Sequence, residues 1–129
     1  MNHGIAKMLS FSSIPVFSIW GNNDGDKANI MRVALAPGSN LEIGLETFDI
    51  IEIEKRKIFL THYPILAKPM AKSGDFDAVF YGHDHKFNLD KIGNCLIVDP
   101  GEISAHKTSK ATFAIYDTET NEAEIVNLE

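Results

Sequence analysis

Three apolar runs of the chain each end in a short polar cluster that contains asparagine or histidine. The clusters are Gly21-Asn22-Asn23-Asp24, Thr61-His62 and Gly82-His83-Asp84-His85. The runs before them are rich in the β-branched and aromatic residues typical of strands. In open α/β sheets, ligands bind beyond the carboxyl ends of the strands. The pattern therefore predicts a mixed α/β fold in which the three clusters converge on one crevice.

The remaining elements are predicted from hydrophobic periodicity and from the Gly and Pro residues that separate the apolar runs. Helices are expected at residues 5–11, from an Asp26 cap to Ala36, and around 69–73. Strands are expected at 14–20, 48–53, 57–61, 78–81, 87–92, 95–98, 112–117 and 122–128. A fourth polar cluster, Asp99-Pro100-Gly101-Glu102, follows the strand at 95–98. Without a repeat or a linker, residues 1–129 are expected to form a single domain.

The charge balance limits the classes of partner. The chain has 12 basic and 18 acidic side chains, a net charge of -6. This excess of negative charge argues against a surface built to bind the phosphates of a nucleic acid. A small phosphorylated substrate would need local positive charge, which bound cations supply most simply. The composition therefore favours a metal site over a nucleic-acid interface.

The sequence predicts a cytoplasmic protein without a membrane partner. No apolar stretch approaches the roughly 20 residues of a membrane span, and no basic segment followed by an apolar core marks the N-terminus. Cys95 is the single cysteine and lies in an apolar run, so we expect a buried thiol.

Asn22, His62, His83 and His85 are the candidate metal ligands. Neutral imidazoles and an amide oxygen suit divalent Mn, Fe, Co, Ni or Zn, whereas Ca and Mg prefer oxygen ligands throughout. The His83-x-His85 spacing lets two imidazoles reach different ions of a pair roughly 3.5–4 Å apart. For each histidine taken alone, a structural or surface role stands as the alternative. The four side chains together, at three strand ends, favour the metal interpretation.

The three clusters resemble the third, fourth and fifth motifs of the calcineurin-like metallophosphoesterases, in order and in spacing. They are most similar to the small bacterial and archaeal phosphodiesterase branch, whose third motif reads Gly-Asn-Asn-Asp or Gly-Asn-Cys-Asp. Lys72-Ser73-Gly74, Asp77-Ala78-Val79 and the cluster at 99–102 fit that branch as well. The resemblance runs from about Ile14 to the C-terminus. It implies the family's α/β sandwich of mixed β-sheets flanked by helices.

The resemblance also implies a function and its residues. The chain would hydrolyse small phosphodiesters or phosphomonoesters with a hydroxide activated by two divalent transition-metal ions, Mn, Ni, Fe, Co or Zn, with manganese as the metal to test. Asn22, His62 and His83 would hold one ion and His85 the other. Asn23 stands where many relatives have a histidine that assists the leaving group, so it offers hydrogen bonds but no proton. Asp24 would orient its own loop or a ligand, with a plain turn aspartate as the alternative.

The family's first two motifs, Asp-x-His and Gly-Asp-x-x-Asp, should lie upstream of Gly21, where the sequence has no aspartate or glutamate. The chain is therefore expected to be a phosphoesterase domain that lacks its first βα units, either as a piece of a longer protein or as a shortened product. An exposed sheet edge would favour a homo-oligomer. The alternative function is a catalytically incomplete metal-binding fragment or subunit with a role in assembly.

Overall fold

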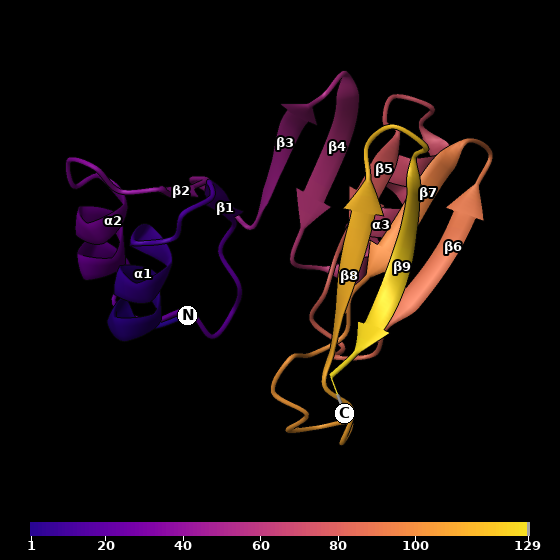
Figure 1. Cartoon of the computed structure of the whole chain (residues 1–129). Helices are drawn as coiled ribbons and strands as arrows, with labels where there is room; N and C mark the ends of the chain where they lie inside the picture. The colour runs from indigo at the N-terminus through magenta and orange to yellow at the C-terminus, as the bar shows by residue number, and fades with distance from the viewer. Residues whose placement is uncertain (129) are drawn as a thin grey trace. The chain divides into compact units, whose positions relative to one another are not determined.

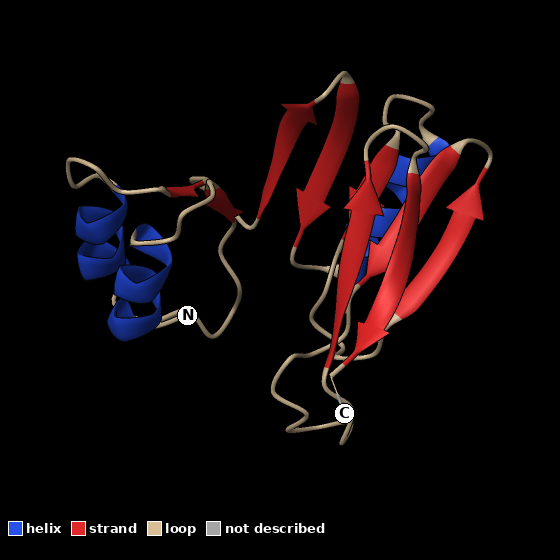
Figure 2. Ribbon diagram, viewed as in Figure 1, coloured by secondary structure: helices blue, strands red, loops and turns tan. Residues whose placement is uncertain are grey.

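The computed structural model describes residues 1–128. They form two compact units, unit 1 from Met1 to Phe48 and unit 2 from Asp49 onward. Figure 1 labels the helices and strands of both units, and Figure 2 colours them by type. The mixed α/β composition predicted from the sequence is confirmed. Within the described residues, no helix has the length and apolar character needed to cross a bilayer.

Unit 1 packs two short helices against a pair of parallel strands. The strands are β1 (Val16–Ser18) and β2 (Leu41–Ile43). Helix α1 (His3–Ser10) begins at Asn2, whose side chain accepts a hydrogen bond from the Ile5 amide. Helix α2 (Lys27–Ala34) begins at the predicted Asp26 cap, which accepts from the Asn29 amide. The buried core of this unit consists of Ala6, Trp20, Ile30, Leu41 and Ile43.

In unit 1, one predicted strand was wrong in extent and one strand was not predicted. The strand expected at 14–20 covers only Val16–Ser18, because its parallel pairing with β2 is limited to three residues. Strand β2 was not predicted, since a run as short as Leu41-Glu42-Ile43 gives too few alternations to show a period of two. Its two apolar side chains are nevertheless buried, at 3% and 7% exposed.

Unit 2 is a layered structure with a five-stranded sheet in the middle, ordered β3-β4-β5-β7-β6. Its strands are β3 (Phe48–Ile53), β4 (Arg56–Thr61), β5 (Ala78–Phe80), β6 (Asn88–Ile92) and β7 (Cys95–Asp99). Helix α3 (Pro64–Lys72) packs on one face of the sheet. The hairpin of β8 (Thr112–Asp117) and β9 (Glu122–Asn127) packs on the other face. The hairpins predicted around Gly93-Asn94 and at the end of the chain are confirmed.

The central strands are covered on both faces, which explains their continuous apolar sequence. Toward α3 the core contains Phe59, Ala67, Ala71, Val79, Cys95 and Ile97. Toward the β8–β9 hairpin it contains Ile58, Ala78, Leu96 and Val98. Cys95 is 3% exposed, so the predicted buried thiol is confirmed.

The helix predicted around 69–73 in fact begins at Pro64. Pro64 stands in the first turn, where its missing N–H is harmless, whereas Pro69 lies inside the helix. Burial of Ala67 and Ala71 against the sheet offsets the loss of the Pro69 hydrogen bond. The predicted end is confirmed, because Gly74 closes the helix with φ +81°.

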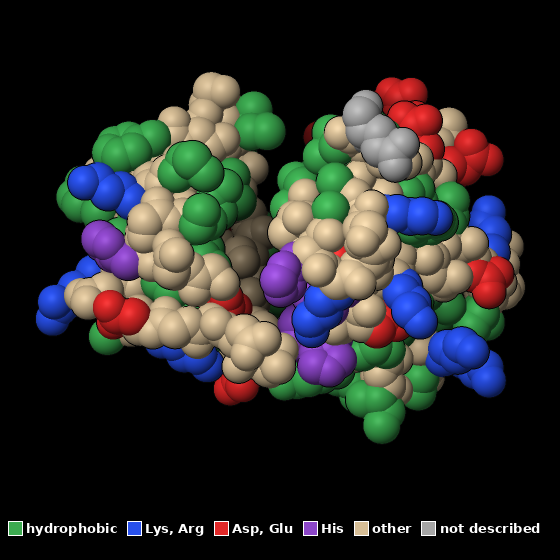
Figure 3. Space-filling view, turned by 90° about the horizontal axis from the view of Figure 1, so that it is seen from below, with side chains coloured by type: hydrophobic (Ala, Val, Ile, Leu, Met, Phe, Trp, Pro, Cys, Tyr) green, Lys and Arg blue, Asp and Glu red, His purple; other side chains and the backbone are tan. Residues whose placement is uncertain are grey.

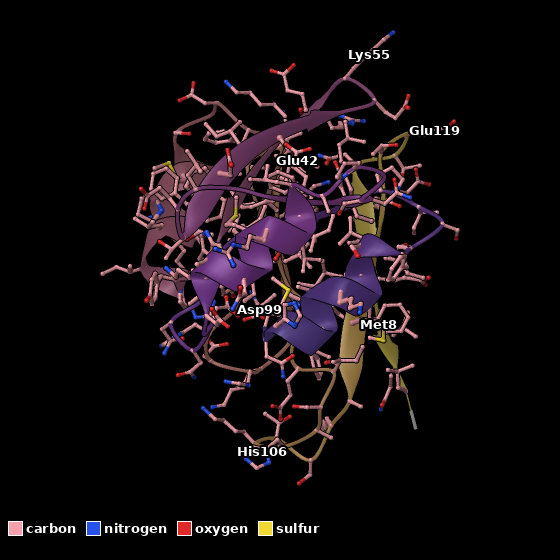
Figure 4. All side chains as sticks on the ribbon, turned by 90° about the vertical axis from the view of Figure 1, so that its left-hand side faces the viewer. Met8, Glu42, Lys55, Asp99, His106 and Glu119 are labelled. Carbon is pink, nitrogen blue, oxygen red and sulfur yellow. The ribbon has the colours of Figure 1, made fainter. Side chains whose placement is uncertain are left out.

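Strands β4, β5 and β7 run parallel and are neighbours in the sheet. Three loops therefore leave the same edge of unit 2, at Thr61-His62, at 82–85 and at 99–102. At the opposite end of these strands, side chains connect the strand starts to the β8–β9 turn. Arg56 donates to the Thr118 carbonyl (2.7 Å), and Asn121 donates to the carbonyls of Asp77 (3.1 Å) and Asn94 (3.3 Å). Figure 4 labels Lys55 and Glu119 at this end and His106 at the loop end.

Candidate metal centre

His62 and His83 meet at the loop edge of unit 2. His62 directly follows β4, and His83 follows the Gly82 that ends the β5 run. The Nδ1 atom of His83 lies 3.0 Å from Nε2 of His62, with the rings nearly perpendicular at 85°. The Tyr63 ring packs against both imidazoles, with centroids 4.9 and 5.2 Å away. In the space-filling view, histidine side chains gather on one face of unit 2 (Figure 3).

The distance between these two ring nitrogens fits a shared cation. Imidazole nitrogens bind divalent transition metals at about 2.0–2.1 Å. Two nitrogens bound to the same ion, with a nitrogen–metal–nitrogen angle of roughly 90°, are therefore about 3 Å apart. Without an ion, the same separation lets one ring donate an N–H to the other. The pair can thus exchange a shared proton for a shared cation with little movement of either ring.

Both loop histidines adopt backbone conformations that are uncommon for residues other than glycine. His83 has φ +84° and His85 has φ +65°. Each such residue costs roughly 1–3 kcal/mol, and conformations of this kind concentrate at functional sites. The surrounding structure of unit 2 therefore holds these two imidazoles in place against a backbone preference.

His85 is oriented by a buried carboxylate. Its Nδ1 lies 2.9 Å from Oε2 of Glu102, which is 6% exposed. Glu102 also accepts hydrogen bonds from the Lys107 amide, from the Thr108 amide and hydroxyl, and from the Ser104 hydroxyl. Burial raises the pKa of Glu102, but these donors outweigh it and hold the pKa at about 2. An ionised carboxylate at Nδ1 selects the His85 tautomer whose Nε2 offers a lone pair.

Asp99 is a second buried carboxyl group behind the same loops. It is 0% exposed, and its Oδ1 accepts from the Gly101 amide at 2.9 Å. Its Oδ2 has no hydrogen-bond partner among residues 1–128. Burial, with a smaller contribution from the neighbouring Asp84 carboxyl, raises the pKa of Asp99 to about 7. Asp99 is therefore a buried acid that releases its proton near neutral pH.

We expect rising pH to destabilise the metal-free chain because of Asp99. In the unfolded chain this carboxyl titrates near 3.8, so between that pH and about 7 only the folded state keeps the proton. The free energy of unfolding then falls as pH rises through this range, by at most about 4 kcal/mol at about 1.36 kcal/mol per pKa unit. Urea unfolding in a chelator, repeated across this pH range, measures the slope.

The matched variants for this experiment are Asp99→Asn and Asp75→Asn. Asp99→Asn keeps the shape of the side chain and should flatten the slope. Asp75 is an exposed carboxylate, so its replacement should leave the slope as it is. An unchanged slope in Asp99→Asn would assign the pH dependence to another group.

Gly101 permits the close packing of the 99–102 loop. It has φ +79°, and a Cβ there would collide with Thr112 Oγ1 and lie 3.3 Å from Phe87 Cβ. Thr112 Oγ1 is held by donating to the Pro100 carbonyl at 2.8 Å. We expect Gly101→Ala to lower the free energy of unfolding by about 2–4 kcal/mol, from left-handed backbone strain and overpacking together.

Gly74→Ala is the control for this prediction. Gly74 has nearly the same φ, +81°, with nothing within 4 Å of an added Cβ. Gly74→Ala should lower the free energy of unfolding only through left-handed backbone strain, by about 1–2 kcal/mol. Equal losses in the two variants, measured by urea unfolding, would show that the loop tolerates the extra methyl group.

The other predicted site residues lie in unit 1, on the turn after β1. Asn22 and Asn23 are exposed, and Asp24 is half-buried. Asp24 accepts a hydrogen bond from the Gly21 amide at 2.5 Å and forms an ion pair with the amino group of Met1. Its carboxylate therefore closes its own turn. Of the predicted ligands, the structure brings together His62 and His83, while His85 pairs with Glu102.

Two residues that contribute to the site, Glu102 and Tyr63, were not among the site residues predicted from the sequence. Glu102 was recognised only as part of a polar cluster, and Tyr63 was not singled out. A signal for Glu102 was present in the Ser104–Thr108 segment, whose amides and hydroxyls need an acceptor. Across residues 1–128, no three His, Cys, Asp or Glu side chains come together as a metal-binding group.

Comparisons with known proteins identify what the chain is similar to. The sequence model of the calcineurin-like phosphoesterase superfamily domain matches residues 3–121. Phosphodiesterase MJ0936 of Methanocaldococcus jannaschii is 31% identical over 116 residues, which cover 88% of this chain and 69% of that protein. The solved structure of an archaeal phosphodiesterase has a TM-score of 0.84 and 27% identity, over 97% of this chain and 76% of that one.

A more distant structure shows the fold alone. Vps29 of Chaetomium thermophilum has a TM-score of 0.58 and 16% identity, over 96% of this chain and 84% of that one. The fold predicted from the motifs, sheets flanked by helices in the manner of the phosphoesterases, is thus confirmed.

Proposed function

This chain belongs to the calcineurin-like phosphoesterase superfamily, and on that premise we propose that it is a metal-dependent phosphodiesterase acting on small phosphate esters. The observation that carries the metal dependence is the 3.0 Å approach of the His62 and His83 ring nitrogens. The 31% identity to a phosphodiesterase supports the substrate class. One phosphoesterase domain spanning residues 1–129 is part of the proposal.

The proposed ligands of one ion are Asn22, His62 and His83. His85 is the proposed ligand of a second ion, through the Nε2 that its pairing with Glu102 leaves as an electron-pair donor. The imidazole-rich donor set favours divalent Mn, Fe, Co, Ni or Zn. When bound, two such ions would supply Lewis-acid stabilisation of phosphoryl oxygens and the activation of water.

The chain's own residues would position these groups. Tyr63 packs against both the His62 and His83 rings and limits their rotation. Asn23 would donate a hydrogen bond to the ester, but it carries no proton to give a poor leaving group. Phosphodiesters with good leaving groups should therefore react best. A pocket of about 220 Å³ beside Asp84, lined also by Ile65 and Tyr81, offers room for part of the ester.

Two further parts of the proposal concern location and assembly. A single buried thiol, Cys95, suits the reducing cytoplasm. Strands β3 and β6 are the two edges of the unit 2 sheet, and unpaired edges favour association between copies. We place no nucleic acid or membrane among the partners.

Hydrolysis of bis(4-nitrophenyl) phosphate by the purified chain tests the function. We expect release of nitrophenol that requires added Mn, stops in chelator and returns when metal is restored. Calorimetry should show two ions bound per chain. Absence of turnover at saturating Mn, Ni, Co and Zn would reject the activity, and a single bound ion without turnover would favour a metal-binding module.

A further inference from the structure

Unit 1 contains a pocket that the proposed phosphoesterase chemistry does not use. It lies between α1, α2 and the turn that follows α2, and its volume is about 390 Å³. This volume falls in the ordinary range of small-molecule sites, roughly 300–1,000 Å³. The two helices that form its walls face the viewer side by side in Figure 4, where Met8 is labelled on α1.

The lining of this α1–α2 pocket is basic, although the chain as a whole has a net charge of -6. Lys7 and His3 enter it from α1 and Arg32 enters it from α2. No aspartate or glutamate is among its described lining residues. Clustered like charges with low-dielectric walls raise the local concentration of a counter-ion.

Neither Lys7 nor Arg32 is neutralised within the described part of the chain. No carboxylate of residues 1–128 lies within ion-pair distance, 4.0 Å, of either side chain. The Nη1 atom of Arg32 makes one long contact, 3.4 Å, to the Asn29 side-chain oxygen. Arg32 lines the pocket, and this single contact leaves most of its N–H groups for a ligand.

Asp26 is the carboxylate that interacts electrostatically with His3 and Arg32, and its side chain is hydrogen-bonded to Asn29. Its side chain accepts from the Asn29 amide group at 2.7 Å, the main reason that the pKa of Asp26 is lowered. The charges of His3 and Arg32 make smaller contributions to that pKa. Asp26 is not among the residues that line the pocket. Among residues 1–128, Asp26 therefore leaves Lys7 and Arg32, which line the pocket, without an ion pair.

The lining also has an apolar part, beside the polar side chains of Ser10, Asn29 and Ser39. Val33 and Pro37 lie on the α2 side, and Phe11, at 78% exposed, stands at the end of α1. A bare inorganic ion would leave this surface uncovered. A ligand that joins an anionic group to an apolar body would use both parts of the lining.

We propose that the α1–α2 pocket of unit 1 binds a small organic anion, a phosphate-type dianion that carries an aromatic or aliphatic group. Arg32 offers a planar fork that matches two phosphate oxygens, and Lys7 adds a second positive charge from the facing helix. The apolar group lies against Phe11 and Val33. The site is lined by residues of unit 1 alone, includes none of the proposed metal ligands and does not depend on a metal ion.

Phenylphosphonate is the probe for this site, because it has the required charge and ring but no ester bond to hydrolyse. It is titrated in a chelator while amide signals are followed by NMR. We expect saturable shifts at Lys7, Ser10, Arg32 and Gly38, with affinity that falls as salt is raised. Methylphosphonate and benzamide, which each lack one half of the ligand, should bind more weakly.

Charge-neutralising variants identify the residues. Lys7→Gln and Arg32→Gln should each weaken phenylphosphonate binding by about tenfold or more, the effect of losing one charge-assisted hydrogen bond. Lys55→Gln removes the same charge from the β3–β4 turn and should leave the affinity unchanged. Equal affinity in all three variants, or shifts confined to unit 2, would overturn the proposal. Unchanged hydrolysis by Lys7→Gln would separate this site from the phosphoesterase centre.

Discussion

Replacing His83 with alanine is expected to reduce metal-dependent phosphodiester hydrolysis by more than about 100-fold, because loss of an outer-shell partner alone already costs about 10–100-fold. His83 supplies one of the two ring nitrogens that lie 3.0 Å apart. Without it, His62 loses the neighbour that makes a shared cation favourable. Hydrolysis of bis(4-nitrophenyl) phosphate and metal uptake by calorimetry should fall together.

The strained backbone at His83 allows a sharper comparison. His83→Gly removes the same imidazole but relaxes the residue at φ +84°, so it should be more stable than His83→Ala by about 1 kcal/mol. Both variants should be equally inactive, which separates loss of the ligand from loss of the fold. His106→Ala removes an exposed imidazole and serves as the control, with activity close to that of the unchanged chain. Full metal uptake by His83→Gly would contradict the assignment.

The second large effect is expected at Glu102. Glu102→Gln should weaken binding of the second ion by about 10–100-fold, the usual consequence of changing a carboxylate that orients a metal-binding histidine. A neutral amide cannot accept from all the donors that surround the carboxylate, which come from the Lys107 and Thr108 amides and the Thr108 hydroxyl. It also no longer selects the His85 tautomer. Affinity for the first ion should change little.

Calorimetry with stepwise metal addition measures these two affinities. His85→Ala should lose the second ion altogether, so Glu102→Gln is expected to lie between it and the unchanged chain. Glu119→Gln changes an exposed glutamate on the β8–β9 turn and is the matched control. If Glu102→Gln binds both ions as the unchanged chain does, the carboxylate serves only to hold its loop.

The elements that could be predicted from the sequence are those whose local signals agree with the packing. Strand β7 is apolar throughout because it is buried on both faces, and the Gly93-Asn94 turn fixes its pairing with β6. Helix α3 could not be placed correctly, because Pro69 has the local signature of a helix start and only burial of Ala67 and Ala71 overrides it. Tertiary contacts decided that boundary.

In the candidate site, too, one contact could be predicted from the sequence and another could not. The strand-end positions of His62 and His83 follow from the parallel order of β4 and β5, so their approach could be anticipated. The pairing of His85 with Glu102 joins residues 17 positions apart, one in the loop after β5 and the other in the loop after β7. No periodic pattern reports such a contact, and the same holds for the complete burial of Asp99.

The hydrogen bonds at the starts of the parallel strands of unit 2 affect how the sequence of such a domain can change in evolution. Arg56 and Asn121 join the starts of the parallel strands to the β8–β9 turn, at the edge away from the histidine loops. These contacts help to align the strands from the end opposite the histidine loops, which form the proposed metal site. Mutations can therefore change the length or the charge of the histidine loops while the strand register is kept. New substrate preferences can then arise on the same scaffold.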